Sequence, residues 1–141
     1  MLSHVCLGTN DPARSERFYD AVLAVLGHSR CADPADPEWQ AWRGWAVYRG
    51  AADQELTLWL CRPFDRRPAS AGNGTMVAFR ARSWSEVEQF HAVALDHGGR
   101  SEGAPGLRPQ YEADFYVAYV RDPDGNKLAA YCRGFTAPQP G

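Results

Sequence analysis

The sequence predicts an α+β fold built from two tandem βαβββ modules. Two observations support this prediction. Sliding the chain by 72 positions superposes its two halves without a gap. Each half also opens with alternating apolar and polar residues and continues with apolar residues at helical spacing. The matched positions are Val5 with Val77, Leu7 with Phe79, Phe18 with Phe90, Leu23 with Leu95, Gly27 with Gly99 and Leu56 with Leu128.

A strand and a helix open the first half. Val5 and Leu7 alternate with less apolar neighbours, which is the period of a strand. Asp11 is a good N-cap, and Pro12 fits the first helical position because its missing N–H costs nothing there. The left-handed conformation that often ends a helix suits Gly27.

The second half repeats this order. Val77 and Phe79 alternate in the same way, and Ser85 with Glu88 predicts a capping box at the start of a helix. The pair Gly98-Gly99 ends that helix. The apolar stripes of the two helices are Phe18, Val22 and Leu26 in the first and Val87, Phe90 and Ala94 in the second.

Three further strands complete each module. The sequence Asp-Pro-Asp-Gly at 122–125 predicts a tight turn between the last two. We expect residues 103–114 to form a long loop. One domain should cover 1–135, with modules 1–62 and 75–135, a linker at 63–74, and a loose tail at 136–141. The expected strands are 28–32, 42–49 and 55–62, then 100–102, 115–121 and 127–133.

Composition excludes several classes of protein. The 141 residues are 45% hydrophobic and carry a net charge of −2 without a basic stripe, so a nucleic acid is not an expected partner. No apolar run is long enough to span a membrane, and no signal peptide is visible, so we expect a cytoplasmic protein.

The four cysteines lack Cys-x-x-Cys spacing, which predicts free thiols. Cys6, Cys61 and Cys132 lie in apolar stretches, where Cys packs as a small core residue.

Strand alternation also predicts which side chains line a cleft. Val5, Leu7, Val77, Phe79, Leu56, Leu58 and Leu60 are expected to pack against the helices. The opposite face then carries His4, Cys6, Thr57, Trp59, Cys61, Met76, Ala78, Arg80, Ala129 and Tyr131. The repeat matches His4 with Met76 and Thr57 with Ala129. A pseudo-twofold axis between the modules would bring these four together.

Several stretches resemble the vicinal oxygen chelate superfamily, which includes glyoxalase I, bleomycin-resistance proteins, fosfomycin-resistance enzymes and extradiol dioxygenases. The likeness covers nearly the whole chain and implies a deep, cupped mixed sheet, the glyoxalase/bleomycin resistance fold. The stretches are SHVCLGTND at 3–11, RFY at 17–19, GTMVAF at 74–79, APGLRP at 104–109 and DPDGNKL at 122–128.

The resemblance also identifies the positions where metal-dependent members hold their ion. These are His4, Thr57, Met76 and Ala129, and only His4 is a good ligand for a divalent metal. We therefore expect a degenerate site without a cofactor. A divalent metal is the alternative, and His4, Cys6 and Cys61 together could hold zinc.

Other residues of the cleft favour ligand binding. Trp59 and Tyr131 are either core residues or the two sides of an aromatic sandwich. Arg108, beside Tyr111 in the long loop, and Arg80 are candidates to bind an anion. The sequence thus predicts a homodimeric protein that binds a small aromatic or anionic molecule without metal. The alternative is a metal-dependent lyase or dioxygenase of the same superfamily with an unusual ligand set, and no residue is identified as catalytic.

Overall fold

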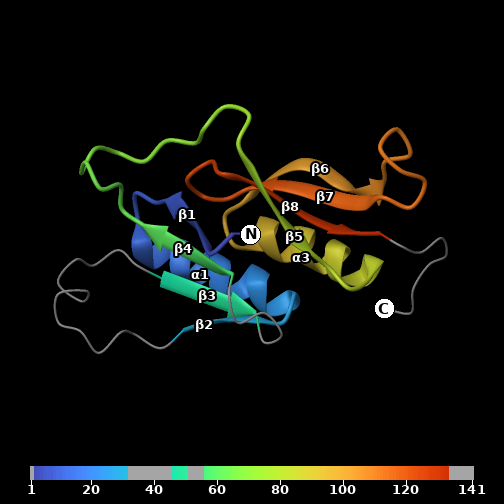
Figure 1. The fold of residues 1–141 in the computed structure, drawn as a ribbon, viewed down its shortest axis with the longest axis horizontal. Helices are drawn as coiled ribbons and strands as arrows, with labels where there is room; N and C mark the ends of the chain where they lie inside the picture. The colour runs from blue at the N-terminus through green and yellow to red at the C-terminus, as the bar shows by residue number, and fades with distance from the viewer. Residues whose placement is uncertain (1, 32–45, 51–55, 134–141) are drawn as a thin grey trace.

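A computed structural model describes residues 2–31, 46–50 and 56–133 of the chain (Figure 1). Several predicted segments lie outside these residues, namely strand positions 32, 42–45 and 55, the segment 33–37 and the tail 136–141. The first module contains β1 (His4–Gly8), α1 (Pro12–Val25), β2 (His28–Arg30), β3 (Ala46–Gly50) and β4 (Thr57–Cys61). The second contains β5 (Met76–Arg80), α3 (Trp84–Asp96), β6 (Arg100–Leu107), β7 (Tyr116–Arg121) and β8 (Lys127–Cys132).

The two modules have the same topology, which confirms the predicted α+β fold. Their sheets are ordered β1-β4-β3-β2 and β5-β8-β7-β6. In each, the first and last strands of the module pair in parallel and the other pairs are antiparallel. β1 and β5 begin 72 residues apart, as the repeat predicts.

The repeat fails at the last strand. His4 lies opposite Thr57, whereas Met76 lies opposite Lys127 and Ala129 lies opposite Ala78. The structural counterpart of Thr57 is therefore Lys127, so the predicted match of Thr57 with Ala129 is wrong by two residues.

The helices begin at positions related by the same repeat. Asp11 caps α1 by accepting a hydrogen bond from the Arg14 N–H. Ser83, which is 72 residues later, caps α3 by accepting from the Glu86 N–H, and Glu86 in turn accepts from the Arg82 N–H at 2.7 Å. The capping box therefore lies two residues before the one predicted at Ser85 and Glu88.

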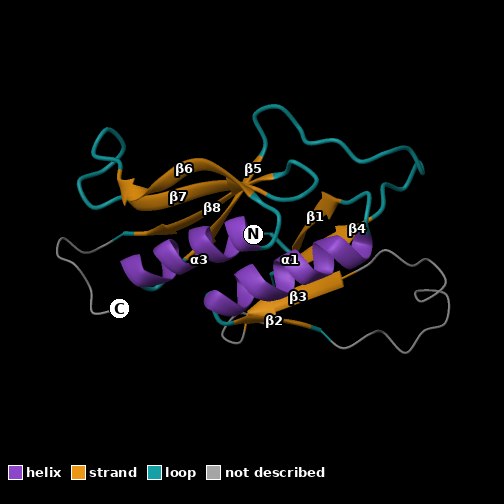
Figure 2. Cartoon of the chain, turned by 180° about the vertical axis from the view of Figure 1, so that it is seen from behind, coloured by secondary structure: helices purple, strands orange, loops and turns teal. Residues whose placement is uncertain are grey.

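One core joins the modules. Figure 2 shows α1 and α3 side by side, and they pack directly against each other as well as against their own sheets. The predicted apolar stripes of both helices are buried, as are Leu7, Leu58 and Leu60. Leu56, expected in the core, is instead 39% exposed because it precedes β4. Among the described residues, neither helix is long and apolar enough to cross a membrane.

The predicted loop at 103–114 is partly a strand. β6 continues to Leu107, with irregular pairing at Gly103 and Gly106. A Cβ at Gly103 would lie 2.9 Å from the Tyr119 Cδ2 atom, so glycine permits this close pairing. Glycine and proline indicate a loop by composition, but here they accommodate bulges in a strand.

Candidate open faces of the two sheets

The face of the first sheet away from α1 carries a contiguous group of side chains. This first open face consists of His4, Cys6, Thr57, Trp59 and Cys61. The rings of His4 and Trp59 lie 5.7 Å apart, and the indole N–H of Trp59 donates to Thr57 Oγ1 at 2.7 Å. The hydroxyl of Ser3 is hydrogen-bonded to His4 Nδ1. Trp59 is therefore fixed by neighbours on its own sheet.

The thiols of Cys6 and Cys61 are neighbours on this face. Cys6 is exposed, so its predicted place in the core is wrong, whereas Cys61 is half-buried and Cys132 is buried. Burial, with the adjacent Cys6, raises the pKa of Cys61 and favours its neutral thiol. In the described part of the chain, no three His, Cys, Asp or Glu side chains gather to hold a metal ion. The zinc group of His4, Cys6 and Cys61 considered above stays a prediction.

The corresponding face of the second sheet carries aromatic and cationic side chains. This second open face consists of Met76, Ala78, Arg80, Ala129 and Tyr131. Tyr131 is stacked on Phe115 with ring centres 5.5 Å apart and an interplanar angle of 18°. Tyr111 meets the edge of Phe115 at 5.5 Å, and the Arg133 guanidinium lies 5.9 Å from the Tyr131 ring.

Arg108 approaches the second open face through Tyr119, which lies opposite Ala129 in the sheet. Its guanidinium donates to the Ala104 carbonyl at 2.7 Å and lies 6.0 Å from the Tyr119 ring. Lys127 approaches the same ring, with Nζ 5.1 Å from its centre. Arg108 is near Tyr111 in the chain, as predicted, but the ring it contacts is that of Tyr119.

Sequence reasoning missed Phe115, Tyr119, Lys127 and Arg133. Alternation along β8 places Lys127 on the same face as Ala129 and Tyr131. The sequence pattern could therefore have identified Lys127 as a residue of this face. Phe115 begins the strand predicted at 115–121, and alternation along that strand puts it on the same side as Tyr119, which lies opposite Ala129. Alternation was therefore a signal for both rings, although not for the stack of Phe115 on Tyr131. Within the described residues, no hydrogen bond, ion pair or ring contact joins the first open face to the second. Trp59 lies against His4 and Thr57, whereas Tyr131 lies against Phe115, and buried Ala129 offers no polar atom.

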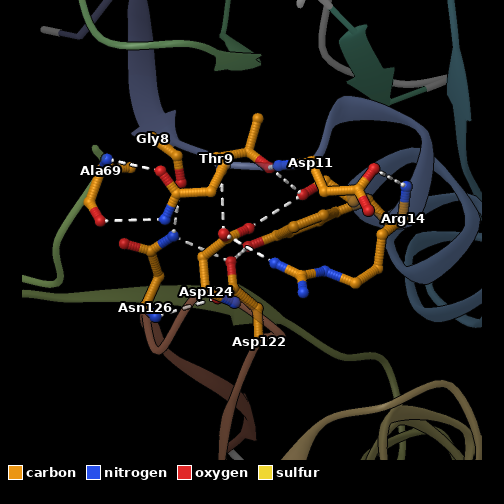
Figure 3. Close-up of polar contacts among 11 residues, drawn as sticks. Gly8, Thr9, Asp11, Arg14, Ala69, Asp122, Asp124 and Asn126 are labelled. Atoms are coloured by element: carbon orange, nitrogen blue, oxygen red, sulfur yellow. Dashed lines mark hydrogen bonds and ion pairs between the residues drawn. The ribbon is translucent and has the colours of Figure 1, made fainter. Parts of the chain in front are cut away.

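A buried polar network joins the modules (Figure 3). Asp122, at the start of the β7–β8 turn, accepts from the Tyr19 hydroxyl of α1 at 2.6 Å and from the amide of Asn126 at 2.9 Å. Its other oxygen accepts from the backbone N–H groups of Asp124 and Asn126. Burial raises the pKa of Asp122 and that of Tyr19.

Asp124 extends this network to the start of α1. Its carboxylate accepts from the Arg14 guanidinium at 2.9 Å, from the Ser15 hydroxyl at 3.0 Å and from the Asn10 N–H at 2.9 Å. Each oxygen of both aspartates is thus engaged. We call this network, from Asn10 to Tyr19 and from Asp122 to Asn126, the module junction. The hydrogen bonds of the module junction stabilise the fold, because they join two segments about 110 residues apart in sequence.

Comparisons with known proteins identify the fold's family. The family model for the Glyoxalase/Bleomycin resistance protein/Dioxygenase superfamily matches residues 1–130. A crystal structure of a glyoxalase/bleomycin resistance protein from Albidiferax ferrireducens T118 is 36% identical, with a TM-score of 0.78, and the match covers 95% of this chain and 99% of that one.

Two more distant structures share the fold. A glyoxalase/bleomycin resistance protein/dioxygenase family enzyme from Burkholderia phytofirmans PsJN is 16% identical with a TM-score of 0.68, covering 94% of this chain and 98% of that one. Lactoylglutathione lyase from Agrobacterium tumefaciens is 17% identical with a TM-score of 0.60, covering 94% and 92%. None of the curated proteins matches significantly. The chain belongs to the glyoxalase/bleomycin resistance protein/dioxygenase superfamily.

Proposed function

We propose that this member of the superfamily binds a small aromatic molecule with an anionic group on its open sheet faces, without a metal ion. The stack of Tyr131 on Phe115, with Arg133 over the Tyr131 ring, carries this proposal. Aromatic rings at this spacing offer a flat surface to another ring, and arginine can bind a carboxylate through two N–H groups. The Arg133 guanidinium is already paired with Glu112 at 2.9 Å. Arg80 is exposed and belongs to none of the described ion pairs, so its guanidinium is the one that would bind the anionic group.

The donor chemistry of the superfamily's metal positions supports the metal-free part of the proposal. His4 offers an imidazole and Thr57 a neutral hydroxyl that already accepts from Trp59. Met76 offers a soft thioether, which suits Cu(I) better than zinc, manganese or iron(II). A divalent ion would find no carboxylate among these residues to offset its charge.

We further propose that residues 1–135 act as one domain and that the protein is a homodimer. β1 and β5 are edge strands, and apolar side chains next to them are exposed, including Leu2 at 58% and Met76 at 44%. Edge strands of this kind are normally covered or paired, so a second copy is a suitable partner. We place the protein in the cytoplasm, because all four cysteines are free thiols.

The proposal is tested by titrating the protein with benzoate and with its neutral analogue benzyl alcohol, followed by NMR. Benzoate should bind more tightly, and Tyr131→Leu or Arg80→Gln should weaken it by about three- to tenfold, the equivalent of one ring contact or one exposed charge. Arg17→Gln is the control, because that exposed arginine on α1 lies outside both open faces.

Two results would contradict the proposal. If benzoate affinity is the same in wild type, Tyr131→Leu and Arg80→Gln, the second open face is not the binding surface. If the purified protein holds one divalent metal per chain and His4→Ala releases it, the metal-dependent lyase or dioxygenase is the correct function.

A further inference from the structure

A hollow of about 460 Å³ lies outside both open faces, at the carboxyl ends of the parallel strands β1 and β4. On one side it is lined by the turn that follows β1. On the other it is lined by the first part of the segment from β4 to β5, the green loop in Figure 1. We call it the linker hollow; its lining residues are Thr9, Asn10, Arg62, Pro63, Phe64, Arg66, Arg67 and Pro68.

The walls of the linker hollow are fixed to each other. The Asn10 amide nitrogen donates to the Ala69 carbonyl at 3.0 Å, and its oxygen accepts from the Ala69 N–H at 2.7 Å. A Cβ at Gly8 would lie 3.0 Å from the Ala69 Cβ, so glycine allows the linker to approach β1. Because a side chain pairs with backbone through two hydrogen bonds, the hollow exists before any ligand binds.

The lining is strongly cationic. Arg62, Arg66 and Arg67 all border the hollow, and none forms an ion pair with any described residue. Asp65 is the only acidic residue from 62 to 68, and its carboxylate accepts from the Arg67 N–H at 3.0 Å. Arginines gathered without acidic partners are typical of sites that bind a doubly charged anion.

The backbone at Arg66 is strained. Its φ of +65° is the left-handed conformation, and Arg66 is the one non-glycine residue of the described chain that adopts it. The strain closes a tight turn in which the Arg66 N–H donates to the Pro63 carbonyl at 3.0 Å. Glycine would adopt this conformation without strain, so an arginine here indicates a use for its side chain.

An exposed aromatic ring lies beside the arginines. Phe64, which also lines the hollow, is 85% exposed. A ring this exposed is unfavourable in water, but it offers a stacking surface for a flat group. The guanidinium groups and the ring therefore offer complementary contacts for one ligand.

We propose that the linker hollow binds the phosphate group of a small aromatic phosphate ester, with Phe64 stacked on the ester's ring. The arginines supply the positive charge for the dianion, and the Asn10–Ala69 pair holds the linker in place. This site is separate from the open faces, because none of its lining residues belongs to them.

The test uses phenyl phosphate and inorganic phosphate as probes, with binding measured by calorimetry in a phosphate-free buffer. Phenyl phosphate should bind more tightly than inorganic phosphate, and Phe64→Leu should remove that difference. Arg66→Gly keeps the turn and removes the guanidinium. It should weaken both probes about tenfold, as expected for a lost charge-assisted hydrogen bond, while Tm stays equal or rises.

Two controls decide whether the effect is local. Arg17→Gln removes an exposed arginine on α1 and should change phosphate affinity less than twofold. Arg100→Gln removes an exposed arginine at the start of β6, outside the lining of the hollow, and should leave phosphate affinity unchanged. The proposal is overturned if neither probe binds saturably at millimolar concentration, or if Arg17→Gln weakens binding as much as Arg66→Gly.

Discussion

Removing one hydroxyl tests whether the module junction stabilises the fold. Tyr19 is fully buried, and its hydroxyl donates to Asp122 at 2.6 Å. A hydrogen bond to a charged acceptor contributes about 1.5–3 kcal/mol. In Tyr19→Phe, the Asp122 oxygen that accepted from Tyr19 still accepts from the Asn126 amide. We therefore expect the free energy of unfolding to fall by an amount near the middle of this range, about 2 kcal/mol. For a chain of this size the loss lowers Tm by roughly 5–8 °C.

The loss of unfolding free energy in Tyr19→Phe should also depend on pH. Burial raises the pKa of Asp122, whereas the hydrogen bond from Tyr19 lowers it. Without the hydroxyl, the pKa of Asp122 rises further above its ordinary value. The folded variant then binds a proton that the unfolded chain has released, so its stability falls as pH rises through this interval. The difference between wild type and Tyr19→Phe should therefore be largest at neutral pH and smaller in acid.

Urea unfolding at pH 7 and at about pH 4.5 measures both effects. Tyr48→Phe is the matched control, because the Tyr48 hydroxyl donates to Asp20, a partly exposed carboxylate, at 2.8 Å. The control should lose less than about 1 kcal/mol. Equal losses in the two variants, or a Tyr19→Phe loss that does not change with pH, would refute the view that Asp122 is a buried charge held by Tyr19.

Three other predictions follow from local geometry. Ser83→Ala removes the N-cap of α3 and should cost about 1 kcal/mol in urea unfolding, whereas Ser85→Ala should cost only a few tenths; the reverse order would place the cap at Ser85. Gly8→Ala brings a methyl group against Ala69 and should cost about 1–3 kcal/mol, and an unchanged stability would show that the linker moves freely there. Zinc or a chelator should shift Tm by less than about 1 °C; a rise with zinc that His4→Ala abolishes would contradict the metal-free proposal.

The sequence predicted the fold because its signals were periodic and repeated. Apolar spacing identified both helices, and the 72-residue repeat related β1 to β5. These features depend on local physics, since strand alternation and helix capping are set by neighbouring residues. The cap of α3, Ser83, is the repeat counterpart of Asp11, whereas the motif at Ser85 and Glu88 predicts a cap two residues later.

The register of β8 was beyond the sequence for a physical reason. Seven residues, 50–56, separate the last paired residues of β3 and β4, whereas five residues, 122–126, separate those of β7 and β8. The shorter connection shifts β8 by two. Because side chains alternate with a period of two, this shift leaves every residue on its predicted face, so alternation cannot reveal it. The shift therefore changes which residues are partners in the second sheet and does not change which face each residue is predicted to lie on.

The module junction and the linker hollow form one mechanical unit, because Asn10 belongs to both. Its backbone N–H donates to Asp124 of the β7–β8 turn, and its side chain pairs with Ala69 of the linker. Asn126 extends the unit by donating to the Gly8 carbonyl at 3.0 Å, next to the point where the linker approaches β1. Residues from both modules thus position one wall of the hollow. The open faces do not depend on contacts between the modules in this way, because the side chains of each face project from paired strands of one sheet. A change that loosens the junction should consequently disturb the linker hollow before it disturbs either open face.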